Sequence, residues 1–269
     1  MTIGITCFTG VILICAYLYQ YSVHQVYWML IGGWLLVFIC GIFFYQPKLR
    51  RKCCVFVIMG FGFLLKYVYV CYTSIYTRQH DVRDFTDEYK GHAGYIQYFI
   101  DNHHLPDFDP TTHYQFYHPP LHHIISAIWI EASERIFDLE PEVAQESLQS
   151  LTLFYAIVIV ILSYRILQHF NLRGCALYIP LIIIAFHPAF ILFSGSINND
   201  VLSVVFILGA ILCTLQWYRN QTLKNILKIA FCVGLGMMTK LSAGIVAIPI
   251  AIVFLVVLIK KCQKRQWYI

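Results

Sequence analysis

Long apolar runs dominate this chain and restrict it to the folds that a lipid bilayer allows. Hydrophobic residues make up 59% of its 269 positions and charged residues 12%. Most of the runs approach the roughly 20 residues that a helix needs to cross a bilayer. We identify eight of them: residues 3–19, 26–45, 53–75, 148–167, 175–194, 201–218, 226–238 and 243–260. Backbone polar groups cannot bond to water in lipid, so the runs predict an all-α polytopic transmembrane protein with about eight spans.

The placement of charge gives these spans an orientation. Thirteen of the 14 acidic residues lie between positions 78 and 150, and the last is Asp200. Most basic residues instead occupy short links between apolar runs, such as 48–52, 219–224 and 260–265. Since basic loops favour the cytoplasm, the N- and C-termini are predicted to be cytoplasmic. The basic residues form no single face interleaved with aromatics, which argues against a nucleic-acid partner.

The predicted order is an N-terminal hairpin, a third span, a long extracytoplasmic loop, five further spans and a basic tail. Their ranges are 1–47, 48–75, 76–147, 148–260 and 261–269. The loop is expected to carry two amphipathic helices, 91–102 and 121–137, at the membrane interface. An irregular segment rich in proline and aromatic residues joins them. The ten cysteines include no CxxC pair, so zinc ribbons and thioredoxin chemistry are not indicated.

An acidic cluster follows the third span. It comprises His80, Asp81, Asp84, Asp87 and Glu88. A carboxylate at the membrane surface can act as a general base on an alcohol. It can also hold a divalent cation through its oxygen atoms. A solvated loop that only keeps this face polar is the alternative interpretation.

Histidines gather in the same loop, which holds eight of the 11 in the chain. His118 and His122 are four residues apart, a spacing that places two imidazoles on one helical face. A helix beginning at Pro119-Pro120 would instead leave His118 just outside it. A zinc site would need a third ligand, for which the candidates are His92, His113, Asp81 and Glu88. Interfacial imidazoles bonded to lipid headgroups or to the backbone are the alternative.

Two later outer turns carry polar residues at the ends of spans. Asn199 or Asp200 would make a good N-cap for the sixth span, and either could contact a substrate. Lys240 ends the seventh span on the predicted outer side, against the usual placement of basic residues. Its ammonium is expected either to pair with a lipid phosphate or to snorkel to the interface.

The order of the loop motifs resembles that of a known family. The motifs are His80-Asp81, Gly91-His92-Ala93-Gly94-Tyr95-Ile96, Leu105-Pro106 and Tyr117-His118-Pro119-Pro120-Leu121, followed by Pro188, residues 194–200 and Thr239-Lys240. This series resembles the membrane glycosyltransferases of the GT-C superfold. Those include the protein O-mannosyltransferases, the aminoarabinose transferases of lipid A, and the glycosyltransferase family 39 or RgtA/B/C/D-like proteins. The resemblance covers about residues 66–249.

The resemblance implies an inverting glycosyltransferase. The donor would be a sugar on a polyprenyl phosphate, and the acceptor a hydroxyl of a lipid, glycan or protein. Asp81 is expected to be the general base, with Asp87 and Glu88 as alternatives. A cation, either a side chain or a divalent metal, would stabilise the leaving phosphate. The candidate substrate-binding residues are His80, His92, Tyr95, Tyr117, His118, Asn199, Asp200 and Lys240.

Other classes of protein stay open. Members of that family are commonly longer, so a truncated member is one expectation. A metal-dependent membrane hydrolase using the loop histidines is another, and loss of a bound metal and of activity in His118→Ala would indicate it. A non-catalytic membrane fragment, an assembly subunit or a transporter is the third. Within the predicted spans, Lys66, Arg165 and Lys228 have no acidic residue to pair with, which argues mildly against transport.

Overall fold

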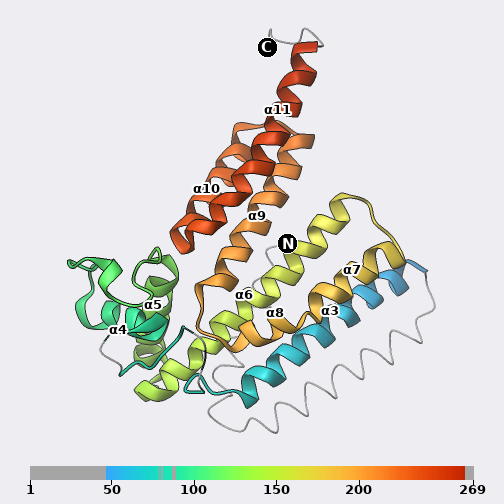
Figure 1. Cartoon of the computed structure of the whole chain (residues 1–269). Coiled ribbons are helices and arrows are strands. Elements are labelled where there is room, and N and C mark those ends of the chain that lie inside the picture. The colour runs from blue at the N-terminus through green and yellow to red at the C-terminus, as the bar shows by residue number, and fades with distance from the viewer. Residues whose placement is uncertain (1–46, 78, 80, 87–88, 264–269) are drawn as a thin grey trace.

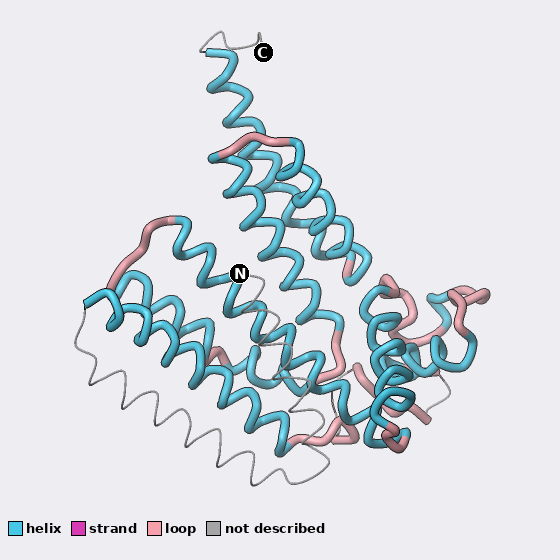
Figure 2. Tube along the Cα trace, turned by 180° about the vertical axis from the view of Figure 1, so that it is seen from behind, coloured by secondary structure: helices cyan, strands magenta, loops and turns pink. Residues whose placement is uncertain are grey.

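The computed structural model describes residues 47–77, 79, 81–86 and 89–263. These residues form helices joined by turns, with no strand among them (Figure 2). The helices are α3 (Pro47–Tyr72), α4 (Gly91–Asn102), α5 (Leu121–Phe137), α6 (Pro141–His169), α7 (Cys175–Ala185), α8 (Pro188–Leu192), α9 (Asn199–Arg219), α10 (Leu223–Thr239) and α11 (Ala247–Gln263). Short 3-10 turns are η1 (Pro110–Thr112), η2 (Phe193–Gly195) and η3 (Leu241–Val246). The all-α prediction is confirmed for this part of the chain.

Four segments of the described chain are long and apolar enough to cross a membrane. They are Cys54–Tyr72, Pro141–His169, Asn199–Arg219 and Leu241–Cys262. The fifth predicted run is a helix pair, Cys175–Ala185 and Pro188–Gly195, bent by 49°, and it raises the number to five if the pair is one span. The seventh run is α10, which has only 17 residues. The runs 3–19 and 26–45 lie outside the described residues, so the predicted number of about eight is not confirmed.

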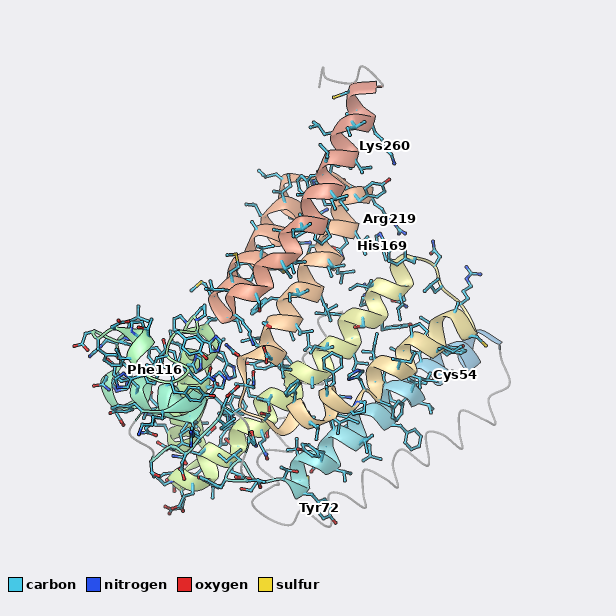
Figure 3. All side chains as sticks on the ribbon, viewed as in Figure 1. Cys54, Tyr72, Phe116, His169, Arg219 and Lys260 are labelled. Carbon is cyan, nitrogen blue, oxygen red and sulfur yellow. The ribbon has the colours of Figure 1, made fainter. Side chains whose placement is uncertain are left out.

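The spans form two neighbouring groups (Figure 1). Helices α3, α6 and α7 pack together, while α9 packs against both α10 and α11. The contact between α6 and α9 joins the groups. The loop helices α4 and α5 lie at one end of the spans, with Phe116 among them (Figure 3). His169, Arg219 and Lys260 lie at the opposite ends of their helices (Figure 3).

Both loop helices occupy the residues predicted for them, and they form a folded loop unit whose core is shared with α6 and α9. Ile96 of α4, Phe116 of the connecting segment and Ile130 of α5 are each at most 1% exposed. They belong to one apolar cluster that continues into α6 and α9. The apolar faces of the two helices are therefore largely buried against protein.

Helix α6 begins earlier than the predicted span. Its 29 residues, at about 1.5 Å per residue, extend about 43 Å, which exceeds the roughly 30 Å of bilayer hydrocarbon. Its first turns therefore belong to the loop unit. There Glu146 accepts a hydrogen bond of 3.0 Å from the Ser74 hydroxyl, which ties α6 to the end of α3.

Lys66 is fully buried in α3, and the broken helix explains its partners. Its ammonium donates to the carbonyl oxygens of Ala185 and Gly62. Ala185 ends α7 just before the bend at Pro188, where carbonyls lose their intrahelical partners. Lys66 thus supplies a hydrogen-bond donor to the buried carbonyl at the C-terminal end of α7.

Gly62 allows the close approach of α3 to the end of α7, and replacing it with alanine should weaken the packing of these two helices. A Cβ at Gly62 would lie 2.8 Å from the Ala185 Cβ. We expect overpacking to cost about 1–3 kcal/mol, partly offset by about 1 kcal/mol of gained helix propensity. Thermal unfolding in detergent would measure the change. Gly234→Ala is the matched control, because nothing lies within 4 Å of a Cβ there. Equal stabilisation of both variants would contradict the tight contact.

Candidate active site

The start of α4 holds the segment that contains Asp81. The backbone N–H groups of His92 and Ala93 donate to the carbonyl oxygens of Asp81 and Val82, each at 3.0 Å. No side chain caps this end of the helix. The first N–H groups of a helix have no intrahelical acceptor, so the Asp81–Val82 backbone supplies acceptors for them. Asp81 is thereby fixed beside the first turn of α4.

Two glycines make this close approach sterically possible. Gly91 has φ +73°, and a Cβ there would lie 2.5 Å from the Val82 carbonyl oxygen. A Cβ at Gly94 would lie 2.6 Å from the Tyr89 carbonyl carbon. Only glycine avoids both the backbone collision and the cost of the left-handed conformation at Gly91. The Gly-His-Ala-Gly motif therefore serves to dock α4 on the acidic segment.

The Asp81 carboxylate is positioned by a tyrosine that the sequence did not single out. The Tyr114 hydroxyl donates a hydrogen bond to Asp81 Oδ1. This bond raises the pKa of Tyr114 above its ordinary value, since it stabilises the protonated phenol. The Tyr114 carbonyl accepts from the Gly91 N–H at 3.0 Å. The backbone and the side chain of Tyr114 therefore both bind the junction between the Asp81 segment and the start of α4. Asp81 itself has φ 68°, a conformation uncommon outside glycine.

A group of histidines in mutual contact begins at His92, in the first turn of α4. His92 Nδ1 and His123 Nε2 are 2.9 Å apart and share a hydrogen bond. The rings of His92 and His118 stack with centroids 5.6 Å apart. Burial, reinforced by His118, lowers the pKa of His92 to about 4. At neutral pH these imidazoles are therefore neutral, so each can donate one hydrogen bond and accept another.

His122 lies deeper and has no hydrogen-bond partner among the described residues. It is fully buried, and neither ring nitrogen bonds to another described residue. Burial, with a smaller effect of His92, lowers the pKa of His122 to about 3. No group of three or more His, Cys, Asp or Glu side chains within the described ranges is arranged to hold a metal ion. The zinc site with His118 and His122 stays a prediction.

Acid should destabilise this histidine core, and His122→Leu should reduce that sensitivity. Unfolded histidine titrates near pH 6.5, whereas the folded His122 pKa is about 3. Between those values only the unfolded chain takes up the proton, so stability falls as the pH drops below about 6.5. The loss is about 2 kcal/mol for this group at pH 5, from 1.36 kcal/mol per pKa unit. Unfolding curves from pH 7.5 to 5 would measure it.

His104→Gln is the matched control, because His104 is exposed. It should keep the wild-type pH dependence, while His122→Leu should reduce that dependence by the contribution of His122, with little change in stability at pH 7.5. Strong destabilisation by His122→Leu at pH 7.5 would instead show that its ring nitrogens bind something in the native protein.

An ion pair joins the first turn of α9 to the residue that follows α10. The Lys240 ammonium donates to Asp200 Oδ1. Asn199 is buried, and its amide donates to the Thr239 carbonyl at 3.1 Å. The cap of α9 is Asn198, whose side chain accepts from the Asp200 N–H at 2.7 Å. The expectation that Asn199 or Asp200 caps this helix is therefore wrong, and their side chains bind the Lys240 turn instead.

These separate parts of the chain meet around the imidazoles. Helix α5, which begins just after His118, contacts both α9 and α10. Burial is the main cause that lowers the pKa of His92 and of His118, and the charges of Asp81, Asp200 and Lys240 act on both. The fold therefore brings together one acid from the loop, the ion pair between α9 and the end of α10, and two neutral imidazoles. A base, a hydrogen-bonding surface and an ammonium group are the parts needed to activate a hydroxyl and to stabilise a leaving anion.

The other site candidates lie at differing depths. Tyr117 is 51% exposed, with its ring 4.6 Å from that of His118. Tyr95 is buried and stacks on Phe116 at 4.1 Å, so it packs beneath the site. His80, Asp87 and Glu88 lie outside the described residues.

A family model described as dolichyl-phosphate-mannose-protein mannosyltransferase matches residues 118–269. The chain belongs to this family. The match starts at His118 and includes Asp200 and Lys240. It confirms the resemblance drawn from the loop motifs, and with the apolar helices it makes the chain an integral membrane protein of a glycosyltransferase family. No curated protein matches the chain, and no solved structure does.

Three polar side chains that hold the mannosyltransferase-family site together were not predicted. The Gln79 amide joins the Asp81 segment to the turn before α9, donating to Gly195 O at 3.3 Å and accepting from Ile197 N–H at 3.4 Å. From α6, Gln149 donates to the same Gly195 oxygen, at 3.0 Å, and Thr152 to Ser194 O, at 2.8 Å. A glutamine and a threonine inside an apolar run were the available signal, since polar groups in a span need partners.

Proposed function

We propose that this chain transfers a sugar from a polyprenyl-phosphate donor to a hydroxyl acceptor, with inversion at the anomeric carbon. The acceptor is a lipid, a glycan or a protein. The observation that carries the proposal is the meeting of Asp81, Asp200 and Lys240 around His92 and His118. Membership of a mannosyltransferase family supports the reaction class.

Asp81 is the proposed base. Its Oδ1 accepts the Tyr114 hydroxyl, which orients the carboxylate that we propose takes the proton of the acceptor hydroxyl. The acceptor oxygen forms a bond to the anomeric carbon while the bond from that carbon to the phosphate oxygen breaks. The proton ends on Asp81 and the electron pair on the lipid phosphate. Asp87 and Glu88 are the alternative bases in the same loop.

Lys240 is the proposed partner of the leaving phosphate. Its side chain lies at the proposed outer end of α10 and is 28% exposed, so a phosphate can reach it. Asp200 holds it in place before the donor binds. His118 and Tyr117 lie at the more open edge of the site and are proposed to contact the sugar, with His80 as a further contact. The buried His92 and Asn199 are proposed to support that surface.

The proposed topology has eight crossings, with both termini in the cytoplasm and the loop outside. The support is the separation of charge within the fold. The loop unit carries the acidic residues, while His169, Arg219 and Lys260 lie at the far ends of their helices (Figure 3). Basic groups favour the cytoplasmic side.

A transfer assay tests the function directly. The purified chain, reconstituted in liposomes, is given a panel of radiolabelled polyprenyl-phosphate sugars together with lipid, glycan and peptide acceptors. We expect transfer from at least one donor, with inverted anomeric configuration in the product. Retention of configuration, or release of free sugar without transfer to any acceptor, would contradict the proposal.

A further inference from the structure

A second surface with distinct chemistry lies between α9 and α10, at the ends remote from the loop. The groove has a volume of about 630 Å³, and its lining includes Leu223, Lys224, Leu227, Lys228, Phe231 and Cys213. Lys240 marks the other end of α10. The 17 residues of α10, at about 1.5 Å each, separate the two ends by about 25 Å. The groove is therefore separate from the candidate active site.

The groove is lined by an apolar stripe that no other described part of the chain covers. Leu223, Leu227 and Phe231 follow one another at intervals of four along α10 and are 70%, 61% and 64% exposed. Each such side chain gains about 1.5–3 kcal/mol when it is removed from water. The stripe begins at the N-terminal end of α10, which packs on the candidate membrane span α9, so acyl chains of the bilayer can cover it.

Two lysines border the stripe and give it a charge. Lys224 and Lys228 are one turn apart, and both are exposed. Neither has a hydrogen-bond acceptor or an ion-pair partner among the described residues. Two other basic groups at this end have acceptors: Lys260 donates to the Tyr218 hydroxyl, and Arg219 to the His169 carbonyl.

No acid competes for these two ammonium groups. After Glu146 the sequence has a single acidic residue, Asp200, which lies at the opposite end of α9 and is paired with Lys240. The N-terminus of α10 adds the positive end of a helix dipole at the same place. The groove thus combines an apolar floor for a hydrocarbon chain with an excess of positive charge at its rim.

We infer that this groove binds one anionic glycerophospholipid from the membrane leaflet opposite the loop. The lipid phosphate lies between Lys224 and Lys228, and an acyl chain follows Leu227 and Phe231 toward the middle of the membrane. Basic pockets between helices select anionic headgroups in this way. The inference does not depend on the proposed glycosyl transfer.

Native mass spectrometry of the full chain in detergent tests the inference. The delipidated protein is titrated with dioleoyl phosphatidylglycerol or with dioleoyl phosphatidylcholine. We expect one phosphatidylglycerol molecule to bind about tenfold more tightly than phosphatidylcholine. The double variant Lys224→Ser/Lys228→Ser should lose that preference. Lys260→Ser/Lys261→Ser is the matched control, because it removes the same charge from the same end of the molecule, and it should keep the preference.

Other outcomes of the same experiments would overturn the inference. Equal binding of the two lipids, or an equal loss in both double variants, would show only non-specific attraction and overturn the inference. A dimeric mass with no bound lipid would show that a second copy covers the groove. A salt titration of the wild type provides a test that needs no variant. Raising the salt to about 1 M, where charges are screened beyond about 3 Å, should abolish the preference, and a preference unchanged by salt would contradict a role for the lysines.

Discussion

Asp81→Asn should reduce kcat for sugar transfer by about 10²–10⁴-fold, the usual contribution of a general base. The amide keeps the size of the carboxylate and can still accept the Tyr114 hydroxyl through its oxygen, so the fold should be preserved. It cannot accept the proton of the acceptor. Initial rates with a saturating donor, measured beside thermal unfolding, would separate loss of chemistry from loss of folding.

Asp84→Asn is the matched control for this variant. Asp84 lies in the same acidic segment and is exposed, and its carboxylate accepts only the nearby Thr86 N–H, at 3.2 Å, among the contacts described. It should retain near wild-type activity. Full activity of Asp81→Asn, together with loss in Asp87→Asn or Glu88→Gln, would move the base to the later acids. Equal loss in Asp84→Asn would point to a general effect of loop charge.

Tyr114→Phe should give a graded effect through the same carboxylate. Removing one hydrogen bond of about 0.5–1.5 kcal/mol predicts a loss of roughly 2–12-fold. Without that donor the charged carboxylate is less stabilised, so the acid limb of the kcat/KM profile should move to higher pH. An unchanged profile with a lower rate would indicate that Tyr114 only supports the fold.

The sequence predicts the local elements of this protein well, because local chemistry determines them. The two loop helices occupy the predicted residues 91–102 and 121–137, where Gly91 and Pro120 mark their starts. The third run is predicted to end at 75 and α3 ends at Tyr72, while the sixth is predicted to start at 201 and α9 starts at Asn199, so the change in hydropathy locates these boundaries to within three residues. The start of α6 does not, since its first turns carry Glu142 and Glu146 and are helical through tertiary contacts with α3 and α5.

Contacts between distant residues could not be predicted from one sequence. Asp200 and Lys240 are 40 positions apart, and neither position indicates that the other is its partner. Likewise, the loop histidines suggest a polar, interfacial surface, whereas His122 and His123 are fully buried. Packing against α4 and α6 decides their burial, and a count of histidines carries no information about packing.

Lys240→Gln should reduce kcat by about 10²–10³-fold, comparable with the loss of one preorganised group that stabilises developing charge. Its amide can still bond to Asp200, but it carries no charge to offer the leaving phosphate. The Asp200–Lys240 pair is partly exposed, 36% and 28%, so stability should fall by no more than about 1 kcal/mol. Transfer rates and unfolding temperatures measured on the same preparations would separate these two effects.

Asp200→Asn is the informative companion to this variant, because it removes the partner and leaves the ammonium in place. If Lys240 acts on the phosphate, Asp200→Asn should lose less kcat than Lys240→Gln, since the donor phosphate can attract the ammonium by itself. If the pair only joins the turns before α9 and after α10, the two variants should lose the same activity, and Lys240→Arg should restore it in full. A phosphate role instead predicts partial recovery in Lys240→Arg, because the charge is kept while its position changes.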